Sequence, residues 1–268
     1  MKSDEFFARH PVFTRTEFAA SCGTARTPTS RAPDRLLSYH TRQGNLLRVK
    51  QGLYVVVPPG MSPSSAPVDA YLLASRMAED AVLAYHTAFE LHGVAYSSTE
   101  RLLFLSEHRL LPVTFRSLRF RAVPVPDALK TGGFADVGIT VVDRAGLDVR
   151  VTTLERTLVD VLNRPILGGG WEEIWRSLEA VSYFDVAEVI EYALRLDNAT
   201  AVAKVGFFLE QHRDSLSVDE AQLQQLRIHA PTKPHYIRRS SRTPGVLVRD
   251  WNLIVPRSVI ERSWEEFV

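Results

Sequence analysis

Four polar side chains between residues 31 and 42 are spaced so that they would share one face of a helix. They are Arg31, Arg35, Ser38 and Arg42. Successive members are three or four residues apart, and side chains at that interval lie on the same side of a helix. An arginine on such a face can donate two parallel hydrogen bonds to guanine O6 and N7, or bind phosphate oxygens. The spacing therefore indicates contact with a nucleic-acid duplex.

The helix that carries these side chains is predicted over residues 31–43. Ser30 is a suitable N-cap, and Pro33 fits the first turn, where a missing amide hydrogen costs little. Gly44 can adopt the left-handed conformation that ends many helices. The apolar side of the helix is expected to be formed by Leu36, Leu37 and His40.

A β-hairpin is predicted directly after this helix. Residues 46–49 and 53–57 read as two strands, joined by a turn whose glycine can take a positive φ. Basic side chains near the tip of the hairpin would reach phosphates or an adjacent minor groove. With residues from the loop before the helix, the expected DNA contacts are Arg26, Ser30, Arg31, Arg35, Ser38, Arg42, Arg48 and Lys50.

Two shorter helices are predicted ahead of this region. Residues 4–9 form the first, which presents two phenylalanines and stops at Pro11. Thr14 and Glu17 have the spacing of a capping box, so they start a second helix over residues 15–21 that buries Phe18. The order of helices and hairpin predicts a winged helix-turn-helix. Units of this kind also occur in proteins that never bind DNA, so a purely structural role stays open.

Charge is distributed unevenly along the chain. Residues 1–60 carry nine Lys/Arg and four acidic residues, a net +5; residues 61–225 carry 15 and 23, a net −8. Residues 226–268 carry eight and four, a net +4. A basic segment beside an acidic remainder is expected when only one part of a protein binds a polyanion, although the net charge of a segment also varies by chance. A Pro-, Gly- and Ser-rich stretch then places a DNA-binding domain at 1–60, a linker at 61–67 and an effector domain at 68–268.

The effector domain is expected to be an α/β domain with a small mixed sheet and C-terminal helices, so that the whole chain is of the α+β class. Strands are predicted at 102–105, 118–123, 138–142 and 147–152, and a closing strand over 251–255 is expected to pack on the same sheet. Helices are predicted at 68–77, 85–91, 154–164 with Thr153 as the cap, from 171 onwards, and at 186–196 and 199–212.

Residues that could support catalysis or metal binding do not form a recognisable set. Cys22 is a lone cysteine at a helix C-terminus, and His86 and His92 are six residues apart, which does not place them on one helical face. Gly168–Gly170 lack the Lys-Ser/Thr of a phosphate-binding loop and are expected to separate two helices. Three aspartates could in principle hold a metal but are better explained as turn residues: Asp136, Asp143 and Asp148. We expect a cytoplasmic, non-enzymatic protein without cofactor or metal.

Two other places in the sequence could serve the effector domain. Arg156 and Asp160 are four residues apart and could pair on a helix surface. Residues 227–249 contain six Lys/Arg and no acidic residue. Three residues of that stretch, Tyr236, Arg238 and Arg239, could form a second nucleic-acid contact, with bases stacked on the tyrosine. A partner-facing loop or an ordinary solvated loop explains the same composition.

Residues 37–54, LSYHTRQGNLLRVKQGLY, resemble the N-terminal winged helix of AbiEi-type antitoxins of bacterial type IV toxin–antitoxin, or abortive infection, systems. The resemblance is carried by Leu37-Ser38, Gly44, Leu47-Arg48 and Gly52-Leu53-Tyr54. Three later segments are similar to the same family: YHTAFELHG at 85–93, the stretch from Thr153 through Arg156 and Asp160 to Gly170, and residues 194–209.

The resemblance implies an antitoxin that counteracts a nucleotidyltransferase-like toxin, with direct contact between the two left open. It also implies a repressor that binds inverted repeats of double-stranded DNA in its own promoter, with possible self-association there and a role in phage defence. The alternative is a winged-helix transcriptional regulator with a ligand-sensing or dimerisation domain and no toxin partner.

Overall fold

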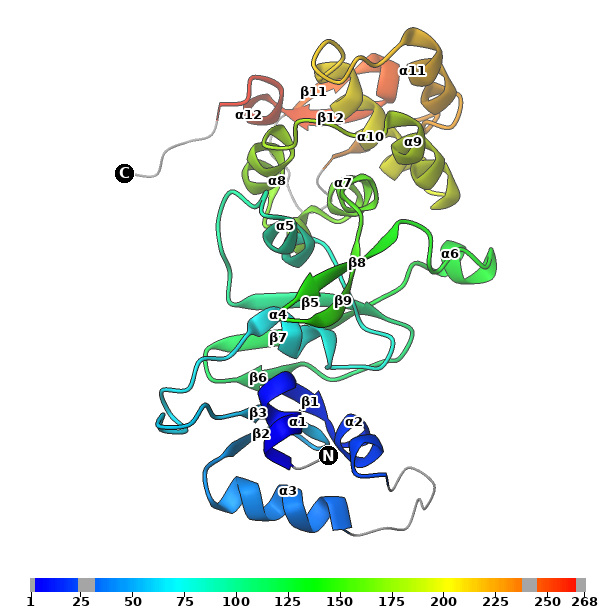
Figure 1. Cartoon of the computed structure of the whole chain (residues 1–268). Helices are drawn as coiled ribbons and strands as arrows, with labels where there is room; N and C mark the ends of the chain where they lie inside the picture. The colour runs from blue at the N-terminus through cyan, green and yellow to red at the C-terminus, as the bar shows by residue number, and fades with distance from the viewer. Residues whose placement is uncertain (1–2, 24–31, 238–244, 264–268) are drawn as a thin grey trace. The chain divides into compact units, whose positions relative to one another are not determined.

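The structure, a computed structural model, describes residues 3–23, 32–237 and 245–263. The chain divides into two compact units (Figure 1). Unit 1 consists of Met1–Leu83, Glu100–Val123 and Val141–Arg150, and unit 2 of Ala84–Thr99, Pro124–Thr140 and Val151–Val268. Among the described residues, no helix is both long enough and apolar enough to cross a membrane.

Unit 1 begins with three helices and a small sheet, which we call the N-terminal region. Its elements are α1 (Ser3–Arg9), β1 (Val12–Thr14), α2 (Arg15–Ser21), α3 (Ala32–Arg42), β2 (Leu46–Lys50) and β3 (Leu53–Val56). The capping box predicted at Thr14 and Glu17 is present at the start of α2. The sheet has the order β1-β3-β2, and both pairs are antiparallel. The helices and the hairpin expected from the sequence are found here, together with β1, which the sequence did not reveal.

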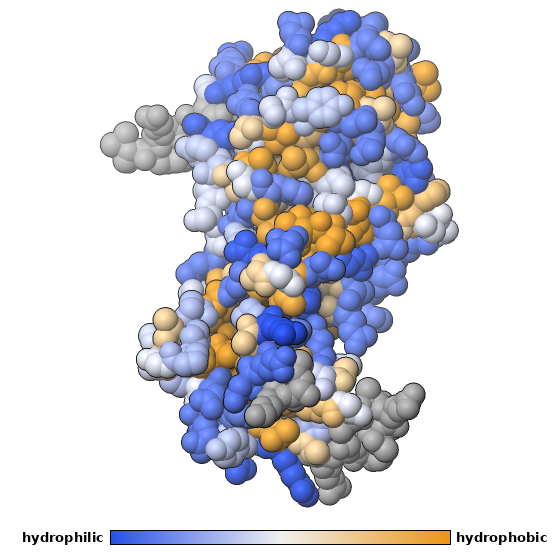
Figure 2. Space-filling view, viewed as in Figure 1, coloured by the Kyte–Doolittle hydropathy of each residue, from blue (hydrophilic) through white to orange (hydrophobic). Residues whose placement is uncertain are grey.

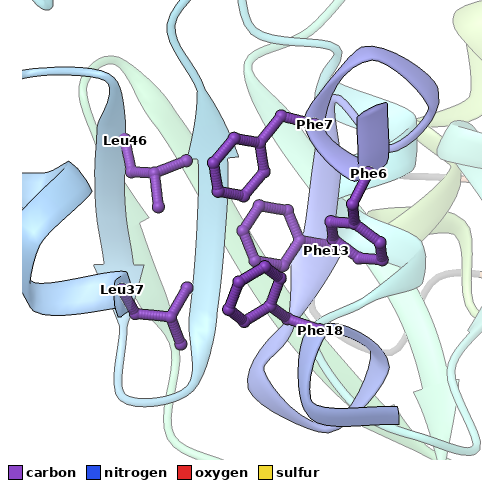
Figure 3. Close-up of a cluster of buried hydrophobic side chains, with 6 residues drawn as sticks. All are labelled: Phe6, Phe7, Phe13, Phe18, Leu37 and Leu46. Carbon is purple, nitrogen blue, oxygen red and sulfur yellow. The ribbon is translucent and has the colours of Figure 1, made fainter. Parts of the chain in front are cut away.

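Aromatic rings hold the N-terminal region together. Four phenylalanines from α1, β1 and α2 pack with one leucine from α3 and one from β2 (Figure 3). The cluster consists of Phe6, Phe7, Phe13, Phe18, Leu37 and Leu46. Rings of this size bury a large apolar area, so a few of them suffice to fix three short helices on a small sheet. The position of α3 therefore depends on Leu37, which points into this cluster.

The rest of unit 1 is built on a sheet of six strands with the order β6-β7-β5-β4-β9-β8. The strands are β4 (Val82–Leu83), β5 (Arg101–Ser106), β6 (Val113–Phe115), β7 (Leu118–Pro124), β8 (Ile139–Arg144) and β9 (Leu147–Thr152). β8 and β9 continue into unit 2 at one end. Helix α4 (Ala70–Ser75) begins at Asp69, whose side chain accepts hydrogen bonds from two amides of its first turn. The four longer strands match the sequence prediction, whereas β4 and β6 are too short to show an alternating pattern.

Unit 2 is mostly helical. Its helices are α5 (His86–His92), α6 (Asp127–Thr131), α7 (Leu154–Asn163), η1 (Pro165–Gly168), α8 (Trp171–Glu179), α9 (Val186–Arg195), α10 (Ala199–Gln211), α11 (Glu220–Arg227), η2 (Arg249–Trp251) and α12 (Arg257–Ile260). Thr153 caps α7 as predicted, and Gly169 and Gly170, with φ of +92° and +102°, separate η1 from α8. The predicted role of these glycines as a break between helices is confirmed.

The end of the chain differs from the sequence prediction. Trp251 lies in η2, and the strand that follows, β12 (Leu253–Pro256), does not join the six-stranded sheet. It is the middle strand of a separate sheet, with β10 (His235–Tyr236) parallel on one side and β11 (Gly245–Val248) antiparallel on the other. The alternation of apolar residues identified a strand correctly, but it carries no information about which sheet the strand joins.

Candidate nucleic-acid interface

The outward face of α3 carries the side chains that the sequence singled out. Leu37 is 1% exposed and marks the inner side of the helix. Because successive residues of a helix are rotated by about 100°, the residues opposite Leu37 are Arg35, Tyr39 and Arg42. All three are exposed. Among the described residues, neither Arg35 nor Arg42 has an ion-pair partner.

Two further residues, Leu36 and Ser38, lie at the margins of this face. Leu36 was expected on the apolar side but is 39% exposed, because it is rotated about halfway between the inner and outer faces. Ser38, exposed as expected, lies at the opposite margin of the outward face. The surface over α3 in Figure 2, at the bottom of the view, accordingly combines hydrophilic and hydrophobic areas.

Each end of α3 has its own stabilising interaction, and the one near its start joins the helix to α2. Near its start, the guanidinium of Arg15 on α2 donates to both carboxylate oxygens of Asp34, at 2.6 and 2.9 Å. The hydrogen bond from Arg15 lowers the pKa of the Asp34 carboxyl. At its other end, Gly44 has a φ of +76° and its amide donates to the carbonyl of Thr41. The helix ends at Arg42, and the left-handed glycine predicted to follow it lies two residues later.

The two basic side chains of the hairpin of β2 and β3 differ in their surroundings: Arg48 is exposed, and Lys50 is bonded internally. Arg48 is exposed, with no ion-pair partner among the described residues. A bulge between Arg48 and Lys50 shifts the register of the hairpin. Beyond this bulge, the Lys50 ammonium donates to the carbonyl of Met77 at 2.6 Å, and burial lowers its pKa. Lys50 is the last residue of β2, beside the hairpin turn, but its ammonium is bonded inside unit 1 rather than extended into solvent.

Further side chains attach the N-terminal region to the remainder of unit 1. Arg76, which follows α4, donates to Glu17 at 3.0 Å and to the carbonyl of Asp148 at 3.3 Å. Arg116, in the turn between β6 and β7, donates to the carbonyls of Pro63 and Ala66 at 2.7 and 2.6 Å. Together with Lys50, these arginines form what we call the basic anchors. They bond residues of α2, of the hairpin and of the 61–67 segment to other parts of unit 1.

The remaining predicted contacts of the N-terminal region, Arg26, Ser30 and Arg31, lie outside the described residues. So do Arg238 and Arg239. Tyr236 is described: it lies on β10 and is 54% exposed. The described part of the second basic stretch thus presents an exposed aromatic ring, and its role in nucleic-acid binding stays a prediction.

Arg156 and Asp160 pair as expected, but they are not on a helix surface. Each side chain is 1% exposed, and Arg156 Nε lies 3.5 Å from Asp160 Oδ2. Arg156 also donates to the carbonyl of Val137 at 2.6 Å, and the Tyr192 hydroxyl donates to Asp160 at 2.8 Å. Burial raises the pKa of Asp160, against the neighbouring guanidinium. A buried pair with this many internal partners holds α7 to its surroundings in unit 2 and is not placed to contact a nucleic acid.

The two histidines considered as metal ligands have separate partners. His86 Nε2 lies 3.1 Å from Glu173 Oε1, and His92 Nε2 lies 2.8 Å from the carbonyl of Thr152. In the part of the chain that the structure describes, no group of three or more His, Cys, Asp or Glu side chains could hold a metal ion.

Sequence reasoning missed two residues: Tyr39 on the outward face of α3, and Arg76, which bonds α2 to the remainder of unit 1. Tyr39 follows Arg35 by four residues and precedes Arg42 by three, so its helical spacing alone could have placed it on the outward face. Arg76 could not have been found in this way, because its partners lie 59 and 72 residues away in sequence.

Comparison with known proteins agrees with the resemblance noted for residues 37–54. Residues 1–57 match the protein-family model described as "Transcriptional regulator, AbiEi antitoxin". The similarity of the later segments to that family stays a prediction, because the match ends at residue 57. A search of curated proteins gives no match.

Among solved structures, the crystal structure of the RV2827C protein from Mycobacterium tuberculosis is similar to this chain. The TM-score is 0.58 at 18% sequence identity, and the alignment covers 96% of this chain and 92% of that one. At this identity the likeness concerns the fold alone. Similarity to a named family is limited to the N-terminus, where residues 1–57 match the model of AbiEi antitoxin transcriptional regulators.

Proposed function

We propose that this chain is an AbiEi-like antitoxin and transcriptional repressor whose N-terminal region is a winged helix-turn-helix that binds double-stranded DNA. One observation carries the DNA-binding part of the proposal. The outward face of α3 holds two exposed guanidiniums, of Arg35 and Arg42, with no internal partner among the described residues. Exposed and unpaired arginines on one helix face suit the donor pattern that the major groove of DNA requires.

In the proposed complex, α3 enters the major groove and the hairpin of β2 and β3 lies beside it. Arg35 and Arg42 read base edges or bind flanking phosphates, and Arg48 contacts the backbone from the hairpin. We leave Lys50 out of this set because its ammonium is already bonded to Met77. The target we propose is an inverted repeat in the chain's own promoter, bound by paired copies.

The antitoxin part of the proposal is supported by the family description of residues 1–57. We propose that the remainder of the chain counteracts a nucleotidyltransferase-like toxin, with or without direct contact. A neighbouring gene for such a toxin would favour this function, and its absence would favour a transcriptional regulator with a ligand-sensing or dimerisation domain.

The DNA-binding proposal is tested by titrating the full chain against fluorescently labelled promoter DNA. We expect Arg35→Ala and Arg42→Ala each to weaken specific binding by about 1–3 kcal/mol, the range for an arginine that contacts a base. Loss of a phosphate contact alone would weaken binding to promoter and unrelated DNA equally, so both duplexes are measured.

A matched control is Arg121→Ala, since Arg121 is an exposed arginine on β7 rather than on α3. This variant should bind promoter DNA as the original chain does. Unchanged affinity in both α3 variants, or equal losses in all three, would refute the assignment of α3 as the reading helix.

A further inference from the structure

The centre of the outward face of α3 is an aromatic ring. Tyr39 lies between Arg35, one turn before it, and Arg42, one turn after it, and is 57% exposed. No other aromatic residue occurs within α3 apart from His40, which is turned partly inward. If α3 enters the major groove, the side chain at the centre of its outward face lies against base edges, while side chains at the margins lie nearer to the backbone.

The Tyr39 ring packs against a second ring, which in turn contacts the buried cluster of the N-terminal region. His40 packs edge-on against Phe7 of the buried cluster, with ring centroids 5.0 Å apart, and Tyr39 packs edge-on against His40 at 5.3 Å. This series of ring contacts links the exposed ring to the core of the N-terminal region. A ring held in this way loses less side-chain entropy on binding than a free one.

The chemistry of the major groove offers one apolar group to such a ring. Thymine presents a 5-methyl group there, next to the acceptor O4, and none of the other three bases carries a methyl group on that edge. Arginines on either side suit guanines or phosphates, and the ring between them suits a methyl group. Leu36, 39% exposed at the margin nearest to Tyr39, adds apolar area on the same side.

We propose that Tyr39 is a specificity-determining residue of α3 that reads the 5-methyl group of thymine. This inference rests on the proposed DNA-binding function and names the base that the site recognises. The inference predicts that the target has an A·T base pair between the positions that Arg35 and Arg42 contact.

The test uses the full chain and a duplex enriched by it from a random-sequence library. That duplex is synthesised again with single thymines replaced by deoxyuridine, which removes only the 5-methyl group. We expect one replacement per half-site to weaken binding about 4-fold, the amount expected for one buried methyl group. Tyr39→Ala should bind the thymine and uracil duplexes equally, while Tyr39→Phe, which keeps the ring, should retain the difference.

Tyr183→Ala is the matched control, since Tyr183 is an exposed tyrosine of unit 2, and it should behave as the original chain does. Equal binding of thymine and uracil duplexes by the original chain would overturn the inference and leave DNA binding intact. So would a methyl preference that survives in Tyr39→Ala, or a loss in Tyr39→Phe as large as that in Tyr39→Ala, which would assign the contact to the hydroxyl. Failure to enrich any duplex would instead refute the proposed function itself.

Discussion

At the scale of single residues, the surroundings of a basic side chain decide between an internal role and an external one. Arg35, Arg42 and Arg48 extend into solvent, whereas Lys50 is bonded to a main-chain carbonyl within unit 1. Arg156 is buried and hydrogen-bonded to two carbonyls. All of these residues look alike in the sequence. Their partners come from distant segments, and only the folded chain distinguishes the cations that are available to DNA.

The contrast between Arg48 and Lys50 leads to a first prediction. Each cation that neutralises a phosphate steepens the dependence of log affinity on log salt concentration by about 0.9. Arg48→Gln should therefore reduce this slope by about 0.9, and Lys50→Gln should leave it unchanged. Binding titrations at several salt concentrations measure both slopes. A reduced slope in Lys50→Gln would show that the ammonium leaves Met77 to contact DNA.

A second prediction concerns Gly206 on α10. A Cβ atom there would lie 2.1 Å from the buried ring of Trp251, far inside van der Waals contact. Gly206→Ala should destabilise the protein by about 1–3 kcal/mol or more, because overpacking forces the ring or the helix to move. Urea unfolding gives the change in free energy. The double variant Gly206→Ala/Trp251→Leu should lose less free energy of unfolding than the sum of the losses in the two single variants. Losses that add exactly would contradict the contact between Gly206 and Trp251.

At the scale of secondary-structure elements, the carboxylate of Glu173 joins α8 to α5 and to the segment after α5 within unit 2. Glu173 on α8 accepts hydrogen bonds from His86 on α5 and from the amides of Tyr96 and Ser97. Burial opposes its charge, but these donors and two hydroxyls outweigh burial and lower its pKa. Burial likewise opposes protonation of His86, but Glu90, with Oε2 at 3.8 Å from Nδ1, and Glu173 outweigh it and raise its pKa.

This arrangement leads to a pH-dependent prediction for the packing of α5 on α8. Because the pKa of His86 is raised in the folded state, its contribution to stability is complete below the ordinary histidine pKa of 6.5 and is lost as pH rises through the raised pKa of the folded state. The original chain should therefore have a larger free energy of unfolding than His86→Gln. This difference should be greatest at mildly acidic pH and should shrink at alkaline pH. Thermal or urea unfolding of both chains across this range measures it. A difference that grows with pH would contradict the assignment.

At the scale of the whole molecule, the family match covers the N-terminal region alone, and the two proposed activities need not use the same residues. Full-length chains carrying both Arg35→Ala and Arg42→Ala should fail to bind promoter DNA. They should still rescue growth in the presence of the proposed toxin partner, because both substitutions lie on the exposed face of α3. A growth assay with induced toxin tests this separation. Loss of rescue in a stably folded double variant would place the antitoxin activity in the N-terminal region.

Local signals in the sequence predicted much of this fold. The capping box at Thr14 and the glycine at 44 gave the ends of α2 and α3 because both act within a few residues. The same kind of signal at Asp219 and Gln222 starts α11, which was missed because its surroundings are polar. β1 is three residues long and shows no periodicity. The partners of Lys50 and Arg76 could not be predicted, since they depend on how distant segments pack.

The basic anchors have a consequence for how the chain could meet an inverted repeat. Lys50, Arg76 and Arg116 bond the hairpin, α2 and the 61–67 segment to other parts of unit 1. The N-terminal region that carries α3, the proposed reading helix, is therefore held to the remainder of that unit. Two paired copies would then present their helices at one fixed separation and one fixed rotation. Since B-DNA repeats about every 10–10.5 bp, inserting about 5 bp between half-sites would turn one of them to the opposite side of the duplex, whereas a full helical turn would restore the facing. The anchors thus make the phase of the double helix, as well as its sequence, part of what this protein would recognise.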